Sequence, residues 1–226
     1  MGSPFLIRLA NSSTHSSFAN RLRTKRMVIF ENHFTALLHQ NISILDVGGT
    51  EDFWVQMGYH HKSNMRFTLL NIANTNTHHG NFTSLVGDAR KLDNLQDSSS
   101  DIVFSNSVLE HVGTFDDQIL AANHIRRIGK SYFVQTPNYW FPVERHFLFV
   151  GYQYLPLSLR AFFLRRFNLG WFSKAPDKAE LITTVSSIRL LTKRNMRTLF
   201  PEAEIVTERF AGLSKSIIAV KSMQVE

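Results

Sequence analysis

The residues best suited to chemistry stand directly after apolar runs of the chain. Asp46, Gly48 and Gly49 come at the end of the run 42–47, which reads as a buried strand. Glycines let the backbone approach a ligand closely, and free amides at the start of a following helix favour an anionic group such as a carboxylate. A strand that runs into two glycines is also compatible with a purely structural turn, so this signal needs support from other segments.

Two segments with histidine and glutamate follow later apolar runs. Glu110-His111 comes after the run 101–105, and His146 lies downstream of the run 130–135. Imidazole titrates near neutral pH, so His111 and His146 are candidate general bases. The alternative for Glu110 and His111 is packing behind a ligand-binding loop, and for His146 it is an ordinary loop position.

The other histidines include two adjacent pairs. His60-His61 and His78-His79 lie in expected loops, and no carboxylate stands at metal-ligand spacing from either pair. The chain has no cysteine, which excludes disulfides, thiolate metal sites and cysteine nucleophiles. We therefore expect solvated histidines at these pairs and predict no metal site.

Alternating apolar runs and amphipathic segments must position these residues. The expected strands cover 42–47, 66–72, 82–86, 101–105, 130–135, 204–209 and 214–221. Helices are expected over 27–39 and after the N-cap residues Thr50, Thr114 and Thr192, and an apolar segment over 154–167 is also expected to be helical. Too few residues join the last two strands for a crossover, so they should form an antiparallel hairpin. The fold class is α/β, a Rossmann-like doubly wound sheet that is mostly parallel, with ligands at the carboxyl ends of its strands.

Length and composition indicate one globular domain. The chain has 226 residues, of which 43% are hydrophobic, without an apolar run long enough to span a membrane or act as a secretory signal. A cytoplasmic location is therefore the default expectation. We expect a flexible basic N-terminal segment over 1–26 and a domain over 27–226, with an aromatic and basic insertion at about 138–190. The net charge of +7 favours anionic partners.

Three segments, taken in order, resemble one enzyme family. They are Ile44-Leu45-Asp46-Val47-Gly48-Gly49-Thr50, Gly87-Asp88-Ala89, and Asp101-Ile102-Val103-Phe104-Ser105-Asn106-Ser107-Val108-Leu109-Glu110-His111-Val112. The first is similar to the first motif of class I S-adenosylmethionine-dependent methyltransferases, and the second resembles their adenine-binding segment. The third closely resembles the fourth-strand motif of the methyltransferase type 11 group. The domain over 27–226 is accordingly expected to be a methyltransferase domain with the insertion as its substrate lid.

The resemblance implies S-adenosylmethionine as cofactor and a set of residues that bind it. They are Asp46, Gly48 and Gly49 at its amino-acid portion, Asn71 at the ribose, Asp88 and Ala89 at adenine, Ser105 and Asn106 at the methionyl end, and Glu110.

Two positions depart from the family pattern. Thr50 or Asp52 stands where the family has a third glycine, and Asn71 replaces an acidic residue that accepts both ribose hydroxyls, with Asn74 as the alternative match. An amide oxygen accepts hydrogen bonds without the charge-assisted strength of a carboxylate. Weak cofactor affinity therefore stays open as an alternative.

The function implied by the resemblance is methyl transfer to an oxygen or nitrogen nucleophile of a small-molecule, glycan or lipid-linked acceptor. His111 or His146 would then serve as the base. The alternative is a non-catalytic module on the same fold that binds S-adenosylmethionine, S-adenosylhomocysteine or a protein. The aromatic and basic insertion also motivates the hypothesis of peripheral membrane contact. Nucleic acid is not expected as a partner, because the chain lacks an Asp/Asn-Pro-Pro-Tyr motif.

Overall fold

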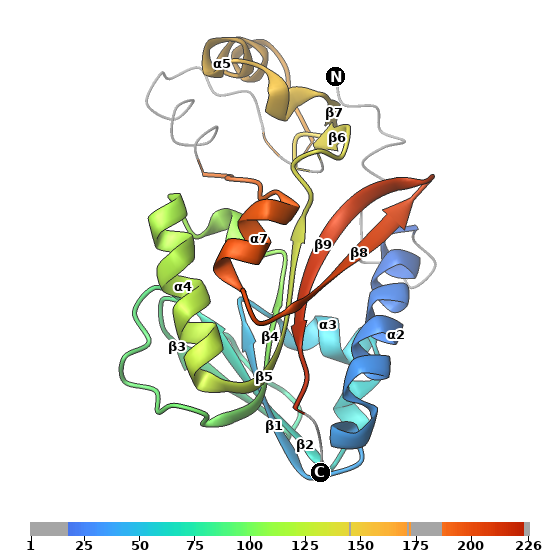
Figure 1. Ribbon diagram of the computed structural model, residues 1–226, viewed down its shortest axis with the longest axis vertical. Helices are drawn as coiled ribbons and strands as arrows, with labels where there is room; N and C mark the ends of the chain where they lie inside the picture. Colours follow the sequence, from blue (N-terminus) through green and yellow to red (C-terminus); the bar gives the residue numbers. More distant parts are fainter. Residues whose placement is uncertain (1–17, 145, 171, 173–186, 224–226) are drawn as a thin grey trace.

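A seven-stranded sheet forms the centre of the structure (Figure 1). The computed structural model describes residues 18–144, 146–170, 172 and 187–223. The strands of the sheet are β1 (Ile42–Val47), β2 (Met65–Asn71), β3 (Phe82–Val86), β4 (Ser100–Asn106), β5 (Gly129–Pro137), β8 (Glu204–Phe210) and β9 (Leu213–Lys221). Their order is β3-β2-β1-β4-β5-β9-β8, with β1 to β5 parallel and β9 antiparallel to both β5 and β8. The predicted doubly wound sheet and its C-terminal hairpin are therefore confirmed.

The strand order reverses between β1 and β4. The chain moves outward from β1 to β2 and β3, and then returns to place β4 on the other side of β1. Val47 pairs with Ser105, so the loops that follow β1 and β4 leave the sheet side by side. Sheets of this kind bind their ligands at such a reversal, beyond the carboxyl ends of the strands.

Helices cover both faces of the sheet. Helices α2 (Phe18–Leu38) and α3 (Glu51–Gln56) pack on one face, and α4 (Phe115–Ile128) and α7 (Lys193–Leu199) pack on the other. The central strands are apolar on both faces for this reason. Thr114 and Thr192 form capping boxes at the starts of α4 and α7, as predicted. Thr50 holds the N-cap position of α3, but its side chain makes no capping hydrogen bond.

Helix α2 begins earlier than predicted. It starts at Phe18 instead of Met27, so residues 18–26 of the expected flexible segment are helical, whereas residues 1–17 lie outside the described part of the chain. The physical reason for the earlier start lies at Arg26, because its buried guanidinium is bound by Glu208 on β8 and holds this part of the chain against the hairpin. The run of basic residues near the N-terminus is therefore not simply a solvated segment.

The chain between β5 and α7 forms a small cluster of its own beyond the carboxyl ends of the parallel strands, at the top of Figure 1. It contains β6 (Val143–Glu144), β7 (Phe149–Val150) and α5 (Leu157–Arg166), which lies within the predicted helix 154–167. Its buried apolar residues are Phe147, Tyr152, Leu164 and Leu169. Large apolar side chains that stay exposed also gather in this segment: Trp140, Val150, Tyr154, Leu157, Leu159, Phe162 and Phe167.

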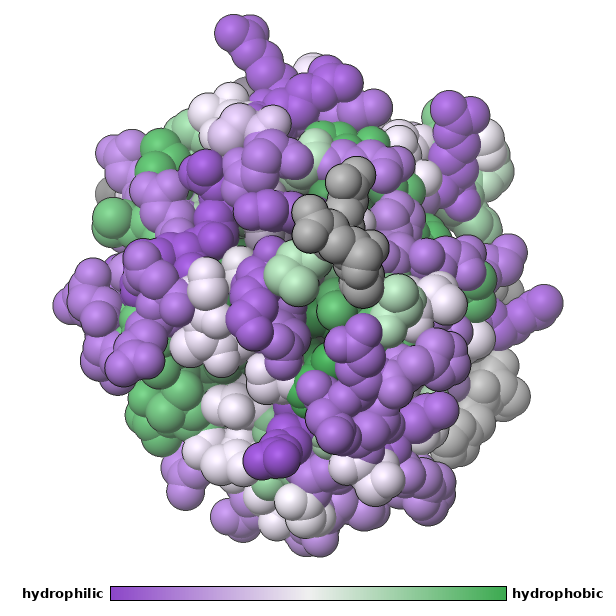
Figure 2. Space-filling model, turned by 60° about the horizontal axis from the view of Figure 1, so that its bottom comes forward, coloured by the Kyte–Doolittle hydropathy of each residue, from purple (hydrophilic) through white to green (hydrophobic). Residues whose placement is uncertain are grey.

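The opposite end of the molecule is more polar. Figure 2 brings the lower end forward and shows hydrophilic residues over most of that face, with apolar residues in small separate areas. Within the described ranges, no helix combines the length and the apolar character needed to cross a bilayer.

Candidate functional site

A cavity lies where the loops after β1 and β4 leave the sheet. Its volume is about 390 Å³, within the range of small-molecule pockets. It is lined by Arg23, Asp46, Gly48, Gly49, Thr50, Asp52, Phe53, Gln56, Phe104 and Asn106. Four of the proposed cofactor residues, from two different strands, therefore share one cavity, and helix α2 contributes to its wall.

The two glycines are required by close packing inside this loop. Gly48 has a φ of +75°, and a Cβ atom there would lie 2.5 Å from a methyl group of Val108 in the loop after β4. A Cβ atom at Gly49 would lie 1.6 Å from Oδ2 of Asp46. Neither position has room for a side chain, so the loops after β1 and β4 can pack directly against each other.

Asp46 is a buried carboxyl group on the wall of the cavity. Its Oδ2 accepts a hydrogen bond of 2.7 Å from Nε1 of Trp54, while its Oδ1 has no partner among the described residues. Burial raises the pKa of Asp46 to about 7, and the Trp54 hydrogen bond offsets part of this rise. A cationic group in the cavity would stabilise the ionised form.

Asn71 connects the loops that follow β1, β2 and β3. Its side-chain Nδ2 donates to the backbone carbonyl oxygen of Gly49 at 2.9 Å. Its backbone carbonyl oxygen accepts from the backbone amide of Gly87, also at 2.9 Å. Asn71 is the last residue of β2, whereas Asn74 is exposed beyond it. An amide nitrogen only donates hydrogen bonds, so Oδ1 is the side-chain atom with which Asn71 could accept a ribose hydroxyl.

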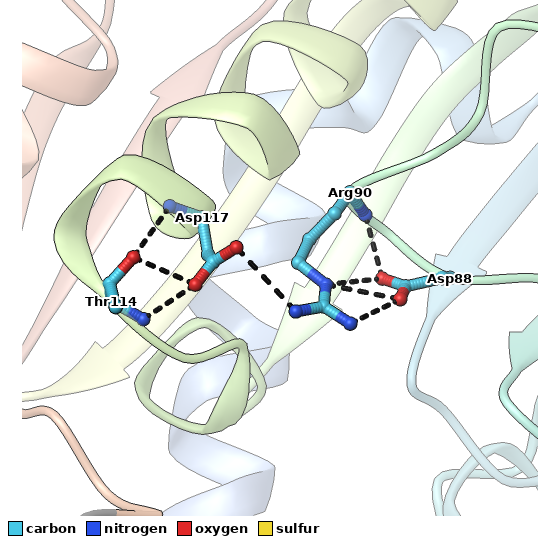
Figure 3. A network of polar contacts seen from close by, with 4 residues as sticks. All are labelled: Asp88, Arg90, Thr114 and Asp117. Carbon is cyan, nitrogen blue, oxygen red and sulfur yellow. Dashed lines mark hydrogen bonds and ion pairs between the residues drawn. The ribbon is translucent and has the colours of Figure 1, made fainter.

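Asp88 belongs to a network of charges that ties β3 to helix α4 (Figure 3). Its carboxylate accepts from the Arg90 guanidinium, with the shortest contact 2.6 Å, and Arg90 also lies 3.5 Å from Asp117 in the capping box of Thr114. The hydrogen bonds from the Arg90 side chain lower the pKa of Asp88 to about 2. Arg90, which sequence reasoning missed, therefore holds Asp88 ionised and oriented, and the adjacent Ala89 is half-buried.

Two other predicted cofactor residues lie behind the cavity. Ser105 is fully buried, and its hydroxyl lies 3.4 Å from the carbonyl oxygen of Val47 on the neighbouring strand. Glu110 is also fully buried and lies beside Thr136, whose hydroxyl donates to its Oε2 at 3.1 Å. Neither side chain lines the cavity.

Asn106 is held by a buried ion pair that joins the first described helix to the last hairpin. The guanidinium of Arg26 donates to Oδ1 of Asn106 and lies 2.7 Å from the carboxylate of Glu208, which in turn accepts from Ser216. Burial alone would raise the pKa of Glu208, but the charge and hydrogen bonds of Arg26 outweigh it, and the pKa is lowered. Sequence reasoning did not identify Arg26 or Glu208, because nothing in their local patterns links them.

The two candidate bases meet at the ends of β4 and β5. The rings of His111 and His146 are 4.8 Å apart between centroids and nearly perpendicular. Glu144, which is buried, has Oε1 2.7 Å from Nδ1 of His146 and accepts from the backbone amides of His146 and Phe147 through Oε2. Glu144 therefore orients the imidazole of His146, a role that its sequence position did not reveal.

One of the two histidine pairs, His78-His79, has a carboxylate partner. Glu51 at the start of α3 lies 2.6 Å from Nδ1 of His79 and accepts from the backbone amides of His78 and His79. Burial opposes ionisation of Glu51, but these hydrogen bonds outweigh it and lower its pKa to about 2. The sequence shows no carboxylate at ligand spacing from these histidines, but the fold brings Glu51 to them from a separate segment, while the side chains of His78 and His79 stay 78% and 41% exposed.

Comparison with known proteins shows which family model and which solved structures the chain resembles. Residues 53–132 match the family model of a methyltransferase domain, and no curated protein matches the chain. Among solved structures, the CurJ carbon methyltransferase has 11% identity and a TM-score of 0.58 over 96% of this chain and 57% of that one. The N-terminal domain of EvdMO1, solved in the presence of SAH and D-fucose, has 14% identity and a TM-score of 0.52 over 89% and 83%.

A third solved structure, an O-methyltransferase family protein from Burkholderia thailandensis, has 11% identity and a TM-score of 0.50 over 95% of this chain and 62% of that one. The chain spans about half the length of the first solved chains it matches, 46% of one and 57% of the CurJ enzyme. The fold is that of class I methyltransferases. The family match covers the segment that contains β2 to β4.

Proposed function

We propose that the protein methylates an oxygen or nitrogen nucleophile of a small-molecule, glycan or lipid-linked acceptor. The observation that carries this proposal is the pair of histidines beyond the carboxyl ends of β4 and β5, at the edge of the sheet where the cavity also lies. Asn106 lines the cavity at the end of β4, His111 follows in the next turn, and His146 meets it from the segment after β5. A nucleophile that loses a proton on methylation would have proton acceptors next to it.

The cofactor assignment follows the cavity and its neighbouring loops. In this proposal Gly48, Gly49 and Asp46 hold the amino-acid portion, Asn71 accepts a ribose hydroxyl, Asp88 and Ala89 border the adenine, and Asn106 faces the methionyl end. Ser105 and Glu110 act from behind these contacts, through the packing of the loop after β4.

S-adenosylmethionine supplies an electrophilic methyl group on a sulfonium. The protein aligns the acceptor in line with it, so that the new O–C or N–C bond forms as the C–S bond breaks. The proton of the nucleophile passes to an imidazole nitrogen. Because Glu144 binds Nδ1 of His146, Nε2 is the atom of that ring that would receive it.

A second, smaller cavity supports an acceptor with an apolar part. It has a volume of about 90 Å³ and lies between the end of β5, β6 and β9, where Phe141, Val143 and Leu190 line it together with Glu144. Helix α5 carries the exposed apolar side chains Leu157, Leu159 and Phe162 together with Arg165 and Arg166. This combination suits a lipid-linked acceptor or contact with an anionic membrane surface.

The test is product identification with methyl-labelled S-adenosylmethionine. Phenols, primary amines, D-fucose and a prenyl-linked sugar would each be incubated with the protein and the products analysed by mass spectrometry. We expect a methyl ether or methylamine, with kcat reduced by about 10²–10⁴-fold in His146→Asn and unchanged in His39→Asn, an exposed control. Methylation at carbon or sulfur alone, or no product from any of these acceptors while the cofactor binds, would overturn the proposal.

A further inference from the structure

We propose that Glu110, His111 and His146 form a binding site for a divalent transition-metal cation. One ligand atom from each of the three side chains lies within 4.8 Å of the others. Two histidines and one carboxylate are a ligand set that binds Zn²⁺ and related ions in enzymes and leaves positions open for water or substrate. The sequence did not indicate this site, because its ligands come from the ends of two different strands.

The spacing of the three groups is close to what an ion requires. Ligand bonds of about 2.0–2.2 Å place neighbouring ligand atoms roughly 3–4 Å apart, so a small inward movement would complete the site. His111 is exposed and His146 is partly exposed, so their rings can make this movement without disturbing the core. Glu110 is fully buried and gives the site a fixed anchor.

The groups behind these side chains hold them in the orientation that coordination needs. Glu144 binds Nδ1 of His146 at 2.7 Å, so Nε2 is the ring nitrogen that would coordinate the ion, the carboxylate–histidine arrangement found behind many metal ions. Thr136 donates to Oε2 of Glu110 at 3.1 Å. A dication would also offset the charge of two carboxyl groups, Glu110 and Glu144, which are both buried.

An ion at this position would change how the acceptor is activated. The imidazole nitrogens would act as ligands in place of bases, and an acceptor oxygen bound at an open position of the ion would release its proton to a solvent water more readily. This catalytic role rests on the proposed function and points to hydroxyl acceptors. The binding of the ion does not depend on the proposed function and can be measured alone.

The experiment is metal binding to the full chain after treatment with a chelator. Zn²⁺ binding would be followed by isothermal titration calorimetry, and Co²⁺ would be added as a spectroscopic probe. We expect one ion per chain and a visible Co²⁺ spectrum that indicates nitrogen and oxygen ligands. Failure to bind either ion would overturn the proposal.

Variants locate the ion. His111→Asn changes an exposed residue and should keep the fold, and it should weaken Zn²⁺ binding by at least about 100-fold, whereas His39→Asn should leave it unchanged. Glu144→Gln should weaken binding by about 10–100-fold, as expected for a positioning residue. Unchanged affinity in His111→Asn and His146→Asn would show that the ion binds elsewhere. If the protein binds no metal ion but still transfers methyl groups, the metal site is refuted and the proposed function is retained.

Discussion

Replacing Asp46 with asparagine should change how stability depends on pH. The substitution keeps the shape of the side chain and an oxygen that can accept from Trp54, but it removes a carboxyl group that burial holds at a pKa of about 7 instead of the usual 3.8. In the wild-type protein the folded state keeps its proton up to about pH 7, whereas the unfolded chain releases it near pH 4. The free energy of unfolding therefore falls as pH rises through this interval.

The size of the effect follows from the shift. A shift of about three pKa units at 1.36 kcal/mol each lowers the free energy of unfolding of the wild-type protein by roughly 4 kcal/mol. This penalty is absent below the pKa of the unfolded chain and complete above pH 7. The asparagine variant carries no such penalty. The difference in unfolding free energy, Asp46→Asn minus wild type, should therefore rise by about 4 kcal/mol between pH 4 and pH 8.

Urea unfolding at both pH values, without cofactor, measures this difference. Asp93→Asn serves as the control, because it removes an exposed carboxylate and should give the same difference at both pH values. An Asp46→Asn difference that does not change with pH would refute the argument that burial perturbs this carboxyl group. If Asp46 faces the cationic part of the cofactor, the more stable variant should also bind S-adenosylmethionine more weakly.

Two further substitutions test the packing around the cavity. Gly49→Ala would place a methyl group against the carboxylate of Asp46. We expect the free energy of unfolding to fall by about 1–3 kcal/mol, measured by thermal melting, and cofactor binding to weaken, measured by calorimetry. Wild-type values in both measurements would contradict this packing. Arg26→Ala leaves Glu208 buried without its cation, and it should lower the free energy of unfolding in urea by about 3–5 kcal/mol. The double variant Arg26→Ala/Glu208→Ala should recover part of this loss. Equal stability of the single and double variants would show that the two residues are not coupled.

Much of the fold could be predicted because buried strands leave a local signal. The apolar runs over 42–47 and 82–86 coincide with β1 and β3, and the capping residues Thr114 and Thr192 stand where their helices begin. The antiparallel hairpin followed from chain length alone, because two residues between β8 and β9 cannot form a crossover. These features depend on residues that are close in sequence.

The contacts that could not be predicted join distant segments. Arg26 was assigned to a flexible basic N-terminal segment, although Glu208 neutralises it inside the fold. Glu51 fitted the start of a helix, but its partners come from the loop before β3. Ser105 was placed at the cofactor by motif position, whereas its place in the sheet turns its hydroxyl toward β1. In each case the pairing is set by three-dimensional structure, which single-sequence patterns do not contain.

The ion pair between Arg26 and Glu208 also bears on the order of folding. Its partners are separated by 182 residues, and it holds Asn106 at the mouth of the cavity. Contacts of such long range form late, because most of the intervening chain must be ordered before they become favourable. During synthesis, the parallel strands can pair as they emerge, but the pocket wall between α2 and β4 cannot close until the hairpin has left the ribosome. Nascent chains that stall before the hairpin should therefore contain ordered strands and no functional pocket.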